Sequence, residues 1–351
     1  MPIPTEPIGS IPRPSELIAA MADPATTASH LEALFDRALK DTIERFEATG
    51  SPVISDGEQT KPSFATYPVH GMPGLGSDGV VIEFADGHSR QLPRLTAGPF
   101  RYQRYAGDYV KAAKRYASRP VKQAVISASA LSLLYPQQAI STYSQEQFLA
   151  DLINEAEKDI RSCFEAGACT VQIDFTEGRL AVKLDPSLNL LKQFVALNNQ
   201  VLARFTEEER TRIGVHTCPG GDQDSTHSAD VGYDRLLPEL FKLKVASFYL
   251  QMASERDPDD VLEIVKSHAG PSQRIFIGVT DPLSSRVETP DEIKMRIIGA
   301  ATVLPPWQIG TTDDCGFSPF ADDGSTAREI AFAKIAARVE GTRAASQALG
   351  L

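Results

Sequence analysis

Eight short apolar segments, each followed by a helical stretch, constrain the fold of this chain most strongly. Near-continuous apolar strands that alternate with helices indicate a parallel sheet covered by helices. Eight such units predict an α/β fold of the (β/α)8 TIM-barrel type. The expected strands are Pro7–Ile11, Pro52–Asp56, Gln123–Ala128, Thr170–Asp174, Arg212–His216, Ala246–Gln251, Ile275–Asp281 and Trp307–Thr312.

Size and composition favour one large enzyme-like domain over residues 1–351, since barrels of this type commonly exceed ~250 residues. The 35 basic and 46 acidic residues give a net charge of −11, which argues against a nucleic-acid or anionic-membrane partner. The four irregularly spaced cysteines do not resemble a disulfide framework. The N-terminus lacks a secretory pattern, and no apolar run approaches the ~18–20 residues of a membrane span. We therefore expect a cytoplasmic protein.

One segment, about residues 62–100, interrupts the alternation after the second expected strand. Val80–Phe84 and Ser89–Leu92 alternate in polarity and flank an Asp86-Gly87 step, which predicts an inserted β-hairpin. The hairpin would lie over the mouth of the barrel. It could form a lid or a substrate wall, or it could be a surface loop without a function.

Polar side chains follow the expected strands at the point where each strand ends. In such barrels the active site is built at the carboxyl ends of the strands, so these side chains should converge on one mouth. They are Ser10, Asp56, Glu58, Asp174, His216, Cys218, Gln251, Asp281, Asp313 and Cys315.

His216-Thr217-Cys218 and the later Cys315 have the residue types of a zinc site. Zinc favours imidazole and thiolate, and a catalytic zinc keeps about three protein ligands and one open position. The alternative is that both cysteines are small buried hydrophobes. His227 and His70 lie in polar or Gly-rich loops and are expected to be solvated.

Glu58 and Asp174 could each bind a substrate ammonium group, or could form loop caps and ion pairs with helices. Ser10 could hydrogen-bond a substrate carboxylate, or could cap the helix that begins near Pro14. No G-x-S-x-G elbow supports a serine nucleophile, and no G-x-G-x-x-G follows a strand.

In order along the chain, these motifs resemble the catalytic barrel of cobalamin-independent methionine synthase and its superfamily of zinc-dependent thiol alkyltransferases, in a short single-barrel form. The resemblance implies zinc as cofactor, held by His216, Cys218 and Cys315. It also implies that Ser10, Glu58 and Asp174 hold the amino-acid part of a homocysteine-like thiol. The motifs are Ile8–Pro12, Asp56–Glu58, Val171–Asp174, His216–Cys218, Gly278–Asp281 with Arg286-Val287, and Asp314–Gly316.

Three positions depart from the family pattern. Gln251 stands where the family has a fourth zinc ligand, Glu, and Leu283 where it has a His that protonates the leaving group. Leu134-Tyr135 replaces the Asn-Trp pair that flanks folate, so we expect Tyr135 and Gln251 to contact substrate. Asp281 is the candidate to replace the missing proton donor, and without that His a methylfolate donor is expected to react weakly.

The predicted function is methyl or alkyl transfer to the sulfur of a small-molecule thiol, by a monomer or homodimer. One alternative is addition of a thiol to an epoxide or another non-folate electrophile. A second is a metal-free lyase that resembles uroporphyrinogen decarboxylase, for which Arg13 alone would gather substrate carboxylates. A third is a zinc-binding barrel without catalytic activity.

Overall fold

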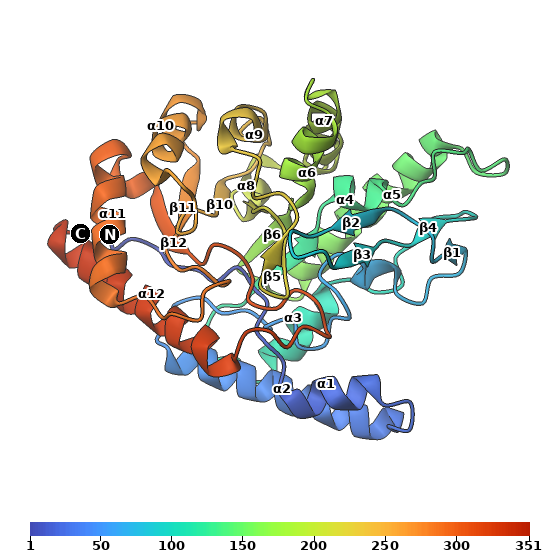
Figure 1. Ribbon diagram of the computed structural model, residues 1–351, viewed down its shortest axis with the longest axis horizontal. Coiled ribbons are helices and arrows are strands. Elements are labelled where there is room, and N and C mark those ends of the chain that lie inside the picture. The colour runs from blue at the N-terminus through green and yellow to red at the C-terminus, as the bar shows by residue number, and fades with distance from the viewer.

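The protein, described by a computed structural model over residues 1–351, is built on a six-stranded parallel sheet with the strand order β12-β11-β10-β7-β6-β5 (Figure 1). Most residues of these strands are buried, which is why they are apolar on both faces. The structure confirms the α/β class. The strands are β5 (Lys122–Ile126), β6 (Thr170–Asp174), β7 (Ile213–Thr217), β10 (Ser247–Leu250), β11 (Arg274–Gly278) and β12 (Ile309–Thr312).

The first two expected strands are wrong as continuous strands. The N-terminal segment pairs with β12 only at Thr5, through a parallel bridge to Thr311, and the second segment pairs with β5 only through Ile54 and Val121. In the N-terminal segment Pro4 and Pro7 each lack a backbone donor that a ladder needs, whereas the second segment has only Pro52, before its bridge. Between the two segments, Ile11 N donates to the carbonyl oxygen of Gly57 at 3.0 Å. Closure into an eight-stranded barrel stays a prediction.

The register of the central strands sets the site. Asp174 on β6 lies opposite His216 on β7, and His216 in turn lies opposite Tyr249 on β10. These pairs lie at or near the carboxyl ends of their strands, where polar side chains were expected to meet. β11 ends at Gly278, three residues earlier than predicted, so Asp281 lies in the following loop and not on the strand.

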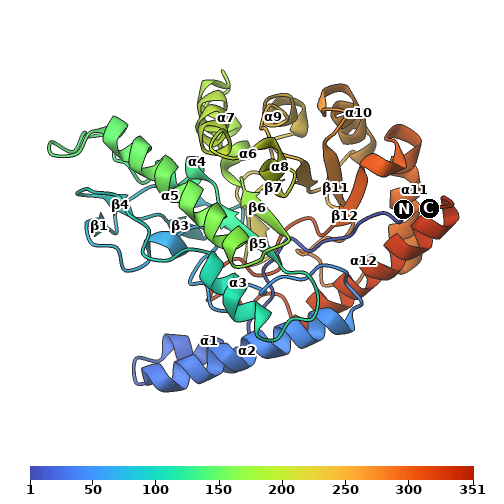
Figure 2. The same cartoon turned by 180° about the vertical axis from the view of Figure 1, so that it is seen from behind.

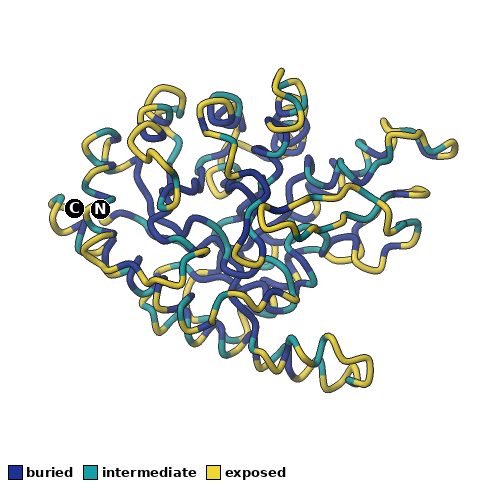
Figure 3. Tube along the Cα trace, in the orientation of Figure 1, coloured by how far each residue is buried: buried dark blue, intermediate teal, exposed yellow.

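Helices surround the sheet and leave their outer faces exposed, whereas the strands form the buried interior (Figures 2 and 3). The two termini lie side by side at one end of the molecule (Figures 1 and 2). The helices are α1 (Ser15–Ala22), α2 (Ala28–Ala48), α3 (Gly107–Lys114), α4 (Ala128–Ser132), α5 (Gln145–Glu165), α6 (Glu177–Leu184), α7 (Asn189–Leu202), α8 (Glu207–Arg210), α9 (Tyr233–Leu240), α10 (Pro258–His268), α11 (Pro290–Val303) and α12 (Arg328–Ala348).

Local sequence explains where several helices begin. Thr289 caps α11 in a capping box with Glu292, and Pro290 occupies the first turn, where its missing N–H is not needed. In α5 the apolar residues at helical spacing, such as Phe148 and Leu152, are fully buried against the sheet. No helix is long and apolar enough to cross a membrane.

The segment around residues 62–100 contains two short antiparallel pairs. β2 (Val81–Glu83) and β3 (Ser89–Gln91) pair about the Asp86-Gly87 turn, with Ile82 opposite Arg90. The other short elements are β1 (Leu75–Gly76) with β4 (Arg94–Leu95), β8 (Gly221–Asp222) with β9 (Ser225–Thr226), and the single turns η1 (Tyr67–Val69) and η2 (Pro306–Gln308).

The β2–β3 hairpin is fixed onto the β8–β9 hairpin, which follows the predicted zinc motif. Ala85 N donates to the Thr226 carbonyl oxygen at 3.0 Å, and the guanidinium of Arg90 is held by Asp222 and Asp322. The insertion therefore lies against the loop that leads away from Cys218, at the carboxyl ends of the strands.

Candidate metal centre

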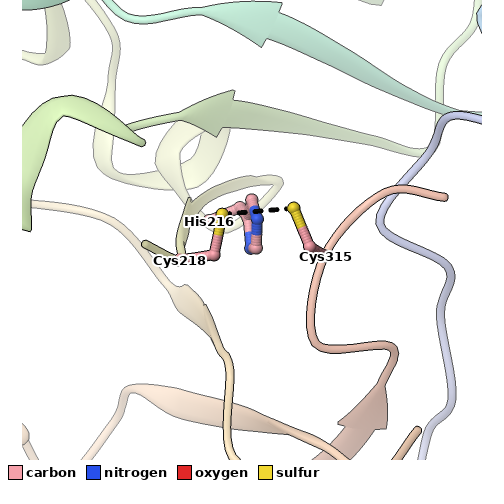
Figure 4. A group of neighbouring side chains, drawn as sticks. All are labelled: His216, Cys218 and Cys315. Carbon is pink, nitrogen blue, oxygen red and sulfur yellow. Dashed lines mark hydrogen bonds between the residues drawn. The ribbon is translucent and has the colours of Figure 1, made fainter. Parts of the chain in front are cut away.

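The side chains of His216, Cys218 and Cys315 point toward one another at the ends of β7 and β12 (Figure 4). Their three potential ligand atoms all lie within 4.8 Å of one another, and the two sulfur atoms are 3.2 Å apart. His216 and Cys218 come from one strand end, whereas Cys315 lies 97 residues further along the chain. The structure thus brings the three predicted zinc ligands together.

The His216 ring is oriented for metal binding. Its Nδ1 lies 3.2 Å from the carbonyl oxygen of Tyr249, so Nδ1 carries the proton and donates to that oxygen. The opposite nitrogen, Nε2, is buried and has no hydrogen-bond partner. A buried unpaired nitrogen is costly, and a metal-bound His commonly donates its other N–H to a carbonyl oxygen in this way. The donor set therefore fits a zinc ion.

The two thiols are not equivalent. The hydrogen bond from Cys315 lowers the pKa of Cys218 well below that of an ordinary thiol, and nearby His216 adds to the effect. The same hydrogen bond raises the pKa of Cys315. Cys218 is therefore the more acidic thiol of the pair, and a thiolate at this position suits a cation site.

Asp314, the residue before Cys315, fixes the loop after β10 next to the metal centre. Its carboxylate accepts hydrogen bonds from the backbone N–H groups of Met252, Ala253 and Ser254, each at 2.8 Å, and from the Ser254 hydroxyl. Asp314 also crowds Gly278, where an added Cβ would lie 1.9 Å from Oδ1. Only glycine at position 278 leaves room for this carboxylate.

Beside the metal ligands lies a small cavity of about 30 Å³, which we call the inner cavity. Ser10, Glu58 and Asp174 line it together with His216 and Cys315, so three of the residues predicted to bind substrate lie at one place. Burial raises the pKa of Asp174 to about 6, although nearby His216 opposes the shift. The Ser10 hydroxyl accepts a hydrogen bond from Ser318 N at 3.2 Å.

Glu58 has a strained backbone conformation and a side-chain partner that sequence reasoning missed. Its φ angle of 56° is unusual for a residue other than glycine. One carboxylate oxygen, Oε1, accepts from the buried ammonium of Lys61 at 3.0 Å. Lys61 Nζ also donates to the carbonyl oxygen of Ala124 at 2.8 Å. The charge of Glu58 is therefore partly balanced before any substrate binds.

A second small cavity, of about 20 Å³, lies on the other side of the two thiols, and we call it the outer cavity. Gln251, Asp281 and Leu283 line it with Cys218 and Cys315. Asp281 accepts from Leu283 N at 3.0 Å, and burial raises its pKa.

Gln251 is oriented by a charged pair behind it. Its Nε2 donates to Glu255 Oε1 at 3.0 Å, and Glu255 also accepts from the buried guanidinium of Arg179. Because the amide nitrogen is used, the amide oxygen is the polar atom that remains for the cavity. Glu255 itself already accepts hydrogen bonds from Arg179 and Gln251.

Three residues that were expected at the mouth do not line these cavities. Asp56 accepts from Glu58 N at 3.1 Å, and Asp313 pairs with Arg338 at 2.7 Å. The third residue is Tyr135. Its hydroxyl donates to the carbonyl oxygen of Tyr143 at 2.8 Å, and its ring packs on Phe148. The neighbouring Leu134 instead lines a larger cavity of about 230 Å³, which we call the apolar cavity. A substrate contact of Tyr135 stays a prediction.

The apolar cavity contains two titratable residues that sequence reasoning did not assign to the site. The expectation that His227 is solvated is wrong, since it is 9% exposed and burial lowers its pKa to about 4. Glu177, at the start of α6, also lines this cavity. Neither directly follows one of the eight expected strands, so the strand-end pattern gave no signal for them. His70 is exposed, as expected.

Comparisons with known proteins match one family model and several distant relatives. The family model described as the catalytic domain of cobalamin-independent synthase matches residues 3–338. The chain is 21% identical over 354 residues to a methionine synthase of Saccharolobus solfataricus, covering 99% of this chain and 96% of that protein. It is 24% identical over 374 residues to the 2-hydroxypropyl-CoM lyase of Xanthobacter autotrophicus, covering 97% and 94%.

Solved structures show the same fold. A B12-independent methionine synthase from Shewanella sp. W3-18-1, in complex with selenomethionine, superposes with a TM-score of 0.78 at 18% identity and full coverage of both chains. A putative vitamin-B12-independent methionine synthase from Listeria monocytogenes gives a TM-score of 0.71 at 20% identity, with 98% of each chain covered. At these identities the likeness concerns the fold alone.

Proposed function

Because the chain belongs to the family of cobalamin-independent synthase catalytic domains, we propose that it is a zinc-dependent transferase that moves a methyl or other alkyl group onto the sulfur of a small thiol. The observation that carries this proposal is the convergence of two thiols on a buried imidazole nitrogen that has no other partner. His216, Cys218 and Cys315 would hold the ion. When bound, zinc would lower the pKa of an incoming thiol, so that the thiol is held as a nucleophilic thiolate near neutral pH.

The inner cavity is proposed as the place for the rest of the thiol molecule. Glu58 and Asp174 supply carboxylates at its wall, and Ser10 supplies a hydroxyl group. A thiol that carries a hydrogen-bond donor or an ammonium group would fit these acceptors. Since Lys61 already occupies one oxygen of Glu58, a full positive charge on the substrate is not essential for binding.

Gln251 is proposed to present its amide oxygen toward the metal centre, because its amide nitrogen is committed to Glu255. The amide carries no charge, so two thiolates and this neutral group would leave the site with no net charge around a divalent ion. Such a site should hold a substrate thiolate more firmly than one with an additional carboxylate ligand.

Addition of the thiol to an epoxide is the second candidate, and the apolar cavity favours it. The cavity walls are largely apolar, with Ile82, Leu131 and Leu134 among them, and its one guanidinium, that of Arg90, is already paired with two aspartates. An uncharged alkyl donor or epoxide suits such walls better than a donor with several carboxylates. The 2-hydroxypropyl-CoM lyase among the relatives is in keeping with this candidate.

Metal analysis of the purified protein followed by a thiol-consumption screen tests the proposal. We expect about one zinc per chain and loss of free thiol only when an alkyl donor or epoxide is present. A protein without zinc that releases CO₂ from polycarboxylate substrates would instead support the metal-free lyase. Zinc without any thiol turnover across methyl, alkyl and epoxide donors would support the non-catalytic barrel.

A further inference from the structure

Glu177 is a buried carboxyl group that the proposed function does not use. It is the first residue of α6 and is 5% exposed. Its Oε1 accepts hydrogen bonds from the hydroxyl groups of Ser127, at 2.6 Å, and Ser129. Its Oε2 is buried and has no hydrogen-bond partner. One oxygen of the carboxyl group is therefore fixed by two hydroxyl groups, whereas the other has no partner in the protein.

Glu177 is the only carboxyl group that lines the apolar cavity. The other ionisable side chains there are Arg90 and His227. Arg90 is paired with Asp222 and Asp322. The Nδ1 atom of His227 lies 2.7 Å from the Ser228 hydroxyl. A molecule in this cavity therefore meets largely apolar walls and one carboxyl side chain, whose second oxygen has no partner in the protein. Within these walls the carboxyl group of Glu177 can donate a proton or accept a hydrogen bond at one defined place.

The apolar cavity adjoins the metal centre. Gly221 lines the apolar, inner and outer cavities alike, and a Cβ at this position would lie 3.8 Å from Cys315 Sγ. Phe64, Thr176 and Gly220 also line both the apolar cavity and the inner cavity. A ligand in the apolar cavity can therefore direct one end toward a thiol held beside Cys315.

We propose that Glu177 is the proton donor to the leaving atom of an uncharged electrophile, such as an epoxide, that binds in the apolar cavity. This inference rests on the proposed function. The thiolate sulfur forms a bond to one epoxide carbon, and the carbon–oxygen bond breaks with its electron pair on oxygen. That oxygen takes the proton of Glu177, so the products are a hydroxyalkyl thioether and the Glu177 carboxylate, which regains a proton from water.

The surroundings favour a protonated Glu177 near neutral pH. Burial raises its pKa to about 7, although the hydroxyl groups of Ser127 and Ser129 act in the opposite direction. Asp174 adds to the increase through its negative charge. The uncharged amide of Asn198 on α7 donates to the Ser129 hydroxyl. The other ionisable side chains that line the cavity with Glu177 are those of Arg90 and His227. A pKa near the working pH is the value that suits a general acid.

The leaving group provides the decisive test. Epoxide opening needs a proton on the departing oxygen, whereas iodide leaves methyl iodide without one. With 2-mercaptoethanol or homocysteine as acceptor, we expect Glu177→Gln to slow the reaction of 1,2-epoxypropane by about 100-fold or more, in the range of general acid catalysis. The reaction of methyl iodide should change less than about 3-fold, because no general acid takes part.

Glu155→Gln is the matched control, since Glu155 is an equally buried carboxylate that hydrogen-bonds to Tyr102 N and the Tyr105 hydroxyl away from the cavities. Both reactions should remain near wild-type rates in this variant. Equal slowing of both reactions by Glu177→Gln would show a structural role and overturn the proposal. So would a loss selective for the epoxide in Asp281→Asn while Glu177→Gln reacts normally.

A measurement without turnover separates this inference from the proposed function. Infrared difference spectra between pH 5 and pH 9 should show a protonated carboxyl stretch that titrates near pH 7 and is absent in Glu177→Gln. If wild-type protein consumes no thiol but this band is present, the proposed function fails and the protonation of Glu177 stands. If the band is unchanged in Glu177→Gln, the proton-donor assignment fails even when thiol turnover is robust.

Discussion

The Nδ1 atom of His216 lies 3.2 Å from the carbonyl oxygen of Tyr249 on the neighbouring strand, and this contact decides which nitrogen of the ring faces the two thiols. The contact follows from the parallel register of β7 and β10, in which the two residues are directly opposite. A strand pairing thus fixes the tautomer of a metal ligand, and a slip of one residue would turn the imidazole away from the site.

Removal of a thiol ligand should remove the metal. We expect wild-type protein to contain about one zinc per chain and Cys315→Ser to contain almost none, because a hydroxyl group is a poor ligand for zinc. Elemental analysis after gel filtration measures this directly. Cys163→Ser, at a buried cysteine far along the chain from the cluster, is the control and should keep its zinc. Full zinc retention in Cys315→Ser would contradict the ligand set.

Neutralising Glu58 should weaken binding of the thiol. We expect Glu58→Gln to raise KM for the thiol by about 10- to 100-fold, with a smaller effect on kcat, since a charge-assisted hydrogen bond contributes roughly 1.5–3 kcal/mol. Glu16→Gln, which breaks an exposed ion pair with Arg37, is the control for loss of a carboxylate. Thermal unfolding of both variants separates binding from stability, because Lys61 loses its buried partner in Glu58→Gln. Unchanged KM would show that the thiol is not held at Glu58.

Position 278 should not tolerate a side chain. In Gly278→Ala the new Cβ would meet Asp314 Oδ1, and the displaced carboxylate would release the loop at Met252–Ser254. We expect a loss of about 1–3 kcal/mol in the free energy of unfolding, together with weaker zinc binding. Gly299→Ala is the control, since nothing lies within 4 Å of its Cβ on α11. That variant should be as stable as wild type, or more stable by up to about 1 kcal/mol.

A buried aspartate on α5 should make the protein less stable as the pH rises. Burial raises the pKa of Asp159 to about 6, above its ordinary value of 3.8. Between these values the folded state binds more protons than the unfolded state, so the free energy of unfolding falls with increasing pH. Asp159→Asn keeps an acceptor oxygen for Ala106 N and can donate from its amide nitrogen to the Tyr67 hydroxyl. It should remove up to about 3 kcal/mol of this decrease. Denaturant unfolding at pH 4 and pH 7 measures it, and parallel curves for the two proteins would contradict the assignment.

Methionine synthesis from methylfolate and homocysteine should be weak or absent. The departing folate nitrogen needs a proton, and Leu283, 37% exposed at the outer cavity, cannot supply one. The apolar cavity also offers no free cationic group for the carboxylates of a folate, because Arg90 is already paired. Product analysis with the pure, zinc-loaded protein decides the question. Rapid methionine formation would show that Asp281, Glu177 or another group protonates the folate.

Much of the site could be predicted from local sequence because parallel strands bring their carboxyl ends to one edge. Thr170–Asp174 forms β6 as predicted, and His216 and Cys218 meet Cys315 because β7 and β12 end on the same side. Residue types at strand ends therefore predict neighbours even when they are distant in the chain. The same reasoning failed for the first two strands, each of which makes only a single bridge to the sheet.

Properties that depend on what surrounds a side chain were decided by the tertiary structure alone. The sequence determined an α/β chain with three convergent candidate metal ligands, since strand periodicity and residue chemistry are local. It could not show that Lys61 pairs with Glu58, that His227 is buried, or that Glu177 has one free oxygen. A glutamate in the first turn of a helix looks the same in sequence whether it caps the helix in solvent or faces a closed cavity. Only long-range packing sets that difference, because burial and hydrogen-bond partners come from segments far apart in the chain.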